Sequence, residues 1–144
     1  MLRYFDSVII ATRPFLASLA RIGLSGLPSR LAGFFQFASH AASIAAREML
    51  SLLRQMDNQR LIRGVMAFEK HFIMQSATAL AISSAVLLGN RDERLRYRES
   101  IELLLRVPGE KNERLISGMR IMEKRLEKLA QHKASRTPYS PRVN

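Results

Sequence analysis

Histidine is the residue type in this chain best suited to acid–base or metal chemistry, and the sequence contains three: His40, His71 and His132. None has a His, Asp or Glu three or four positions away, where a helix would place both side chains on one face. His71 has Glu69 two positions before it, and on a helix those two side chains point in different directions. We therefore predict neither a metal site nor a catalytic histidine.

Other catalytic and cofactor motifs are absent from the sequence. The chain has no cysteine, so it can form no disulfide, thiolate metal site or cysteine nucleophile. It also lacks the glycine-rich patterns that bind nucleotide phosphates. Most of the acidic residues lie between positions 92 and 127 beside basic ones, as on solvated helix faces. We expect a non-catalytic protein without a cofactor.

The strongest compositional feature is a surplus of positive charge. Lys and Arg number 23 against 12 Asp and Glu, a formal net charge of +11, and arginine supplies most of the basic residues. A surplus of this size favours anionic partners such as a lipid surface, RNA or an acidic protein. An arginine-rich codon usage would produce the same composition without any function.

Arginine is concentrated in RDERLRYRES, residues 91–100. Helical spacing brings three of its arginines to one face with Tyr97 nearby, and such a helix can bind phosphates and stack a base. The alternative, which we favour, is a solvated helix start with ion pairs, because three acids in the segment dilute the charge. The candidate anion-binding residues are Arg91, Arg94, Arg96 and Arg98.

The N-terminal third contains a single acid before residue 48, Asp6. Its apolar residues are interspersed with Ser, Thr and Arg, a composition that mitochondrial-type transit peptides share. We favour an ordinary amphipathic segment, which leaves a membrane-associated or a cytoplasmic location open. Residues 2–56 then either pack in a bundle or lie on a lipid surface. On lipid, arginines would face outward and four aromatic side chains inward: Phe15, Phe34, Phe35 and Phe37.

The elements that would position these residues are all helical. Apolar residues recur three and four positions apart, and no segment shows the alternation of a strand. We expect an all-α fold in which four or five helices form one antiparallel bundle over residues 1–133. A disordered basic tail, residues 134–144, follows. The expected helices span residues 4–22, 28–56, 58–88, 91–106 and 112–132.

Three local features of these helices follow from residue type. Pro14 suits the first turn of a helix, with Thr12 as its cap, so a break at Pro14 is the alternative to one continuous helix over residues 4–22. Asp57 or Asn58 can cap the third helix by accepting a hydrogen bond from a free N–H. In the second helix, a continuous apolar face is expected from Leu31 to Met56.

Residues 71–90 contain no Lys, Arg, Asp or Glu. This length is close to the twenty or so apolar residues that cross a bilayer, but polar Ser, Thr and Gln side chains are scattered around the helix. We favour a buried helix at the centre of a bundle, with a membrane-inserted helix as the alternative. The candidate packing or membrane-facing residues are Ile73, Ala77, Leu80, Ala81, Ala85 and Leu87.

The last expected helix carries apolar residues at steps of 4, 3, 4 and 3. Two heptads are too short for an independent coiled coil but long enough to pack on a partner helix. The residues of this seam are Leu115, Met119, Met122, Leu126 and Leu129.

Three functions remain compatible with these features. A membrane-associated structural or interaction protein, bound to an anionic membrane surface or to another protein, fits them best. An RNA- or genome-binding protein would use the arginines of residues 91–98. A soluble adaptor would use the seam of residues 115–129, and helix packing could also join copies of the chain into a homo-oligomer.

Overall fold

The computed structural model describes residues 1–22, 26–62, 67–86, 91–106 and 112–135. Within these ranges the chain forms helices and no strand, which confirms the all-α prediction. The tail beyond Ser135, predicted to be disordered, lies outside the described residues. The helices are α1 (Leu2–Ile22), α2 (Ser29–Asn58), α3 (Ala67–Val86), α4 (Arg91–Arg106) and α5 (Asn112–Ser135).

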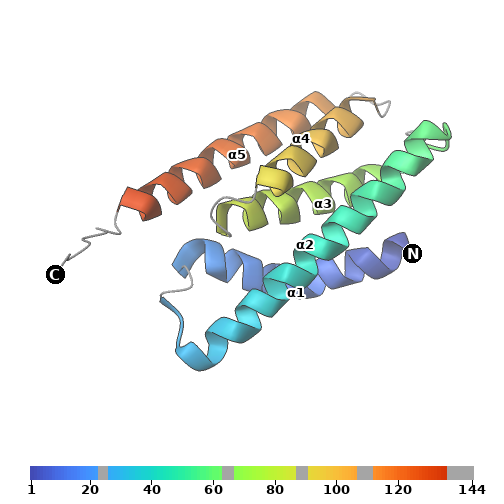
Figure 1. Ribbon diagram of the computed structural model, residues 1–144. Helices are drawn as coiled ribbons and strands as arrows, with labels where there is room; N and C mark the ends of the chain where they lie inside the picture. Colours follow the sequence, from blue (N-terminus) through green and yellow to red (C-terminus); the bar gives the residue numbers. More distant parts are fainter. Residues whose placement is uncertain (23–25, 63–66, 87–90, 107–111, 136–144) are drawn as a thin grey trace.

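The bundle is arranged around α3, with α1 and α2 on one side of it and α4 and α5 on the other (Figure 1). Successive helices run in opposite directions, and α3 contacts all four of the others. One core cluster receives residues from every helix. Its largest fully buried side chains include Ile9, Leu16, Met49, Leu53, Ile73, Leu80, Tyr97, Leu103 and Leu104.

The central position of α3 follows from its composition. Because its apolar residues are not confined to one stripe, the helix gains most from burial on several sides. Ile73, Ala77, Leu80 and Ala81 are all buried. The alanines let neighbouring helices approach closely. Ala85 belongs to α3, but its side chain lies outside the described residues, as does the whole of Leu87.

Residues 71–86 of the uncharged segment 71–90 belong to α3. None of the helices, over the residues described, has the length and hydropathy that a bilayer-spanning helix requires.

The predicted start of the third helix is wrong. Instead of capping a new helix, Asp57 and Asn58 form the last turn of α2, and α3 begins only at Ala67. After Asn58 the N–H of Leu61 donates to the Met56 carbonyl and that of Arg60 to the Asp57 carbonyl, both at 2.8 Å. This is the hydrogen-bond pattern of a Schellman motif, which ends a helix.

Pro14 also differs from expectation, because it lies in the interior of an uninterrupted α1. Thr12 therefore caps nothing. Its hydroxyl donates to the Val8 carbonyl at 2.7 Å, and the Ser18 hydroxyl donates in the same way to the Pro14 carbonyl at 2.9 Å. Such back-bonding satisfies Ser and Thr inside a helix.

The end of α2 gives a first prediction. Arg60 has a φ of 57°, a left-handed conformation that costs a residue with a Cβ roughly 1–2 kcal/mol. Arg60→Gly relieves this cost, so we expect it to raise stability by about 1 kcal/mol in thermal unfolding followed by circular dichroism. Arg60→Ala removes the same charge but keeps the Cβ. If both variants were equally stable, the conformation of Arg60 would not be strained.

Packing around α3 gives a second prediction. Ala81 is buried where helices touch, so Ala81→Leu should overpack the core and lower stability by about 1–3 kcal/mol. Ala17→Leu, at an exposed position of α1, makes the same chemical change without a tight contact. An unchanged melting temperature in Ala81→Leu would show that α3 is not closely packed at this point.

Candidate functional site

At the end of the molecule where α1 finishes and α2 begins, exposed apolar side chains and exposed arginines occur together. Here α2 projects past α3 (Figure 1). We call this surface the α1–α2 tip and define it by its apolar side chains, which are Phe15, Ile22, Leu31, Phe34, Phe35 and Phe37. Of these, Phe37 is 71% exposed, Phe34 51% and Leu31 46%. Large apolar side chains gathered at one exposed place mark a contact surface for another molecule.

The aromatic rings of the tip are held by one another. The ring of Phe15, on α1, meets those of Phe34 and Phe35, on α2, edge to face at centroid distances of 5.0 and 5.3 Å. Edge-to-face pairs of this kind add to the stabilisation that burial provides. The contacts join α1 to α2, so the exposed phenylalanines sit on an ordered base.

The tip corrects one part of the prediction for α2. The expected apolar face is buried along most of its length, including Ala38, Ala42, Ala45, Met49 and Leu53. At its N-terminal end, Leu31 and Phe34 lie on the exposed tip instead of in the core. The sequence indicated that these residues share a helix face, but not where the covering helices stop.

The segments of α1 and α2 that form the tip carry arginine and no acidic residue. Arg13, Arg21 and Arg30 are exposed on the same two helix segments, and no Asp or Glu occurs between Asp6 and Glu48. None of these three arginines forms an ion pair with any residue that the structure describes. Within the described part of the chain, the tip therefore combines arginines that make no ion pair with exposed apolar side chains.

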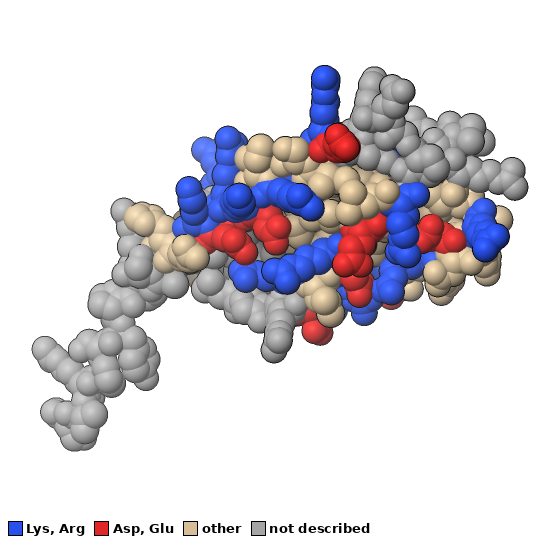
Figure 2. Space-filling model, turned by 90° about the horizontal axis from the view of Figure 1, so that it is seen from above, with Lys and Arg blue, Asp and Glu red and all other residues tan. Residues whose placement is uncertain are grey.

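The arginines of α4 lie in a different electrostatic setting. Figure 2 shows the α4–α5 side of the molecule, where basic and acidic side chains are interspersed. Arg94 lies 3.7 Å from Glu127, and Arg96 lies 3.6 Å from Glu99, which also accepts a hydrogen bond of 3.0 Å from Arg54. Arg98 is exposed, and the side chain of Arg91 lies outside the described residues.

The ring of Tyr97 is not exposed to stack on a nucleic-acid base beside these arginines, contrary to the expectation from spacing. Its side chain is fully buried between α4 and α5, and its hydroxyl donates to the Met119 backbone carbonyl at 2.6 Å. Burial, together with the negative charge of Glu123 and against the opposing effect of Arg120, raises the pKa of Tyr97 to about 12. The ring is part of the core, and what remains on α4 is a partly neutralised row of arginines.

Most of the seam on α5 packs against the core of the bundle. Met119 is buried, and Leu115, Met122 and Leu126 pack against the core while half-buried. The side chain of Leu129 lies outside the described residues. Ile116, which the spacing did not include, is buried as well. These residues hold α5 in place and leave little of the seam for a partner.

The histidines form no cluster. His71 lies 3.4 Å from Asp6, a contact that joins α3 to α1, and both His40 and His132 are exposed. Over the described ranges, no group of three or more His, Cys, Asp or Glu side chains could hold a metal ion.

Comparison with known proteins identifies no relative: no family model, no curated protein and no solved structure matches this chain.

The buried Tyr97 gives a third prediction. The pKa of Tyr97 in the folded protein exceeds the ordinary value of 10. The contribution of Tyr97 to the free energy of unfolding is therefore complete below pH 10 and is lost as pH rises toward 12. Tyr97→Phe should cost about 0.5–1.5 kcal/mol at neutral pH through the lost hydrogen bond. The stability difference between wild type and variant, from denaturant unfolding, should shrink between pH 10 and 12. A constant difference would mean that the hydroxyl ionises as freely in the folded protein as in the unfolded chain.

Proposed function

We propose that this protein is non-catalytic and attaches peripherally to anionic membranes through the α1–α2 tip. The observation that carries the proposal is the coincidence, at one end of the molecule, of exposed Phe34, Phe37, Leu31 and Ile22 with three arginines and no nearby acid in sequence. None of the three arginines makes an ion pair with a described residue. Peripheral helices that bind membranes combine the same two properties, since phenylalanine and leucine enter the acyl boundary while arginine meets lipid phosphates.

Charge and apolar exposure together favour lipid over the other partners. A second copy of this tip would bring arginines against arginines, which opposes self-association through the same surface. RNA would satisfy the arginines, but its phosphates would offer nothing to Ile22, Leu31 or the faces of two exposed phenylalanines. An anionic bilayer offers both a negative surface and an apolar layer beneath it.

The expected contributions are large enough to test. Each arginine near an anionic lipid surface contributes about 1 kcal/mol, and that part decreases as salt screens the charges. Burial of apolar surface in the acyl boundary adds roughly 25 cal/mol for each Å² removed from water, and this part is insensitive to salt. Binding should therefore need anionic lipid and weaken with salt without vanishing.

The fourth prediction addresses the charged part of the tip. Arg21→Gln combined with Arg30→Gln should weaken binding to vesicles of phosphatidylglycerol and phosphatidylcholine by about tenfold to thirtyfold in co-sedimentation, from two lost lipid contacts. Arg98→Gln combined with Arg114→Gln changes the net charge equally but acts on α4 and α5. If both pairs weakened binding to the same extent, net charge alone would explain it and the tip would have no special role.

A matched pair of substitutions at apolar residues tests the apolar contribution of the tip to vesicle binding in the same co-sedimentation assay. Phe34→Ser removes an apolar side chain that is 51% exposed on the tip, and Ile121→Ser removes one that is also 51% exposed, on α5. We expect only Phe34→Ser to weaken the binding that persists at high salt. Loss in neither variant, or equal loss in both, would contradict insertion of the tip.

A further inference from the structure

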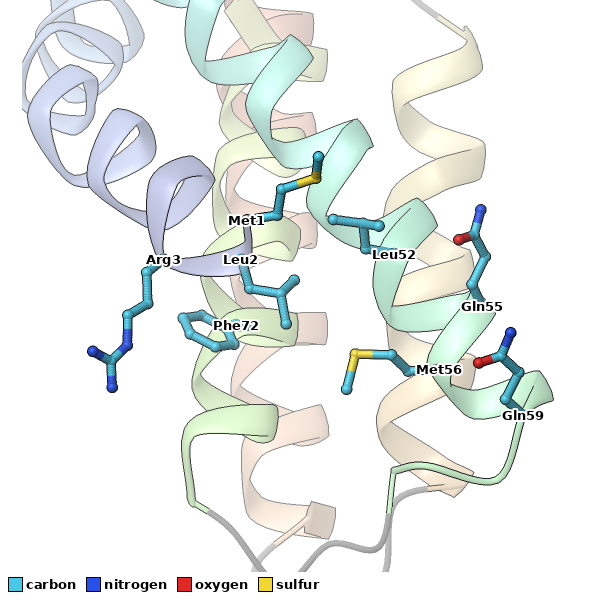
Figure 3. Close-up of a pocket in the computed structure, with 8 residues that line it drawn as sticks. All are labelled: Met1, Leu2, Arg3, Leu52, Gln55, Met56, Gln59 and Phe72. Atoms are coloured by element: carbon cyan, nitrogen blue, oxygen red, sulfur yellow. The ribbon is translucent and has the colours of Figure 1, made fainter.

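A groove lies at the other end of the α1–α2 layer, between the start of α1, the last turns of α2 and the start of α3. Its volume is about 550 Å³, within the range of pockets that bind small molecules. Figure 3 shows Leu2, Met56 and Phe72 pointing toward one another from three different helices. Among the described residues, the lining is Met1, Leu2, Arg3, Leu52, Gln55, Met56, Gln59 and Phe72.

The lining separates into an apolar interior and a polar rim. Leu2, Leu52, Met56 and Phe72 form the interior, and the flexible thioether of a methionine adapts to the shape of an apolar ligand. Gln55, on α2, and Gln59, directly after α2, are exposed, and Arg3, exposed on α1, points away from the apolar side chains (Figure 3). None of the described residues in the lining carries a carboxylate.

The charge at the rim is available to a ligand. Asp6 and Asp57 are the acids closest in sequence to Arg3 and Met56. Asp6 lies 3.4 Å from His71, and Asp57 lies 3.4 Å from Arg106. Arg3 itself makes no ion pair with the residues that the structure describes.

We propose that this groove binds the alkyl chain of a single-chain anionic amphiphile, such as a fatty acid. The chain lies among Leu2, Met56 and Phe72, and the anionic head stays at the solvated rim. There the exposed side chain of Arg3 turns toward the head, since exposed side chains change rotamer within nanoseconds. A purely apolar ligand would leave Arg3 unused, and a small polar anion would leave the interior unfilled. This site is distinct from the α1–α2 tip, because it uses the start of α1 and the end of α2.

Methionine methyl resonances offer a direct test in solution without vesicles, so the result does not depend on membrane attachment. Dodecanoate is titrated below its micelle concentration into protein carrying labelled methionine methyl groups. The resonance of Met56 should shift, while those of Met49 and Met119, buried elsewhere in the core, should not. From octanoate to dodecanoate, affinity should rise about fourfold for each added methylene that enters the groove.

Two variants test which residues contact the anionic head and the alkyl chain of the ligand. Arg3→Gln should weaken dodecanoate binding about two- to fivefold, as for an exposed ion pair, and leave dodecanol binding unchanged. Arg114→Gln, on α5, should affect neither. Met56→Glu should abolish dodecanoate binding, with circular dichroism confirming that the helices persist.

Either of two results would overturn the proposal. If Met56 did not shift, or if Met49 and Met119 shifted with it, the groove would not be the binding site. If Arg3→Gln left dodecanoate affinity unchanged, the anionic head would have no partner at the rim.

Discussion

The burial of α3 is the constraint on which the rest of this structure depends. A helix with apolar residues on several sides must be covered on several sides, and here α1, α2, α4 and α5 share that task. Each of them consequently directs one apolar face inward, as Leu16, Met49, Leu104 and Met119 do. Small residues on α3, such as Ala77 and Ala81, set how closely these helices approach.

The same constraint explains why one end of the molecule is left uncovered. At 1.5 Å per residue, the 30 residues of α2 extend roughly 45 Å, whereas the 20 residues of α3 extend roughly 30 Å. Since α3 is the shorter helix, it cannot cover α2 along its whole length. The excess lies at the N-terminal end of α2, where Phe34 and Phe37 are exposed and no acid lies nearby in the sequence. Apolar residues of the kind that form the core elsewhere on α2 are exposed here.

Spacing and composition predicted the parts of this arrangement that depend on a single helix. The five helices and the burial of Ile73, Leu80 and Met119 follow from periodicity and from the lack of charge in residues 71–90. The turn after Asn58 was missed because polar residues suit both the end of one helix and the cap of the next. Only the backbone conformation of Arg60 distinguishes the two.

Features that depend on several helices were beyond the sequence. The ring of Tyr97 stands among arginines in sequence, yet it reaches the backbone of α5 because the two helices pack there. The exposure of Leu31 depends on where α3 ends, and the groove near Met56 requires three helices to meet. The expected spans of residues 28–56 and 58–88 are nearly equal in length, so the overhang of α2 could not be predicted from them.

The central claim, that the α1–α2 tip enters anionic membranes, is tested most directly by a probe placed at the tip itself. The chain has no cysteine, so Phe37→Cys provides a unique attachment site for an environment-sensitive fluorophore. Ile121→Cys provides a control attachment site on α5. With anionic vesicles, emission from position 37 should shift to the blue while emission from position 121 stays constant. A blue shift at position 121, or none at position 37 when the protein is bound, would contradict the account.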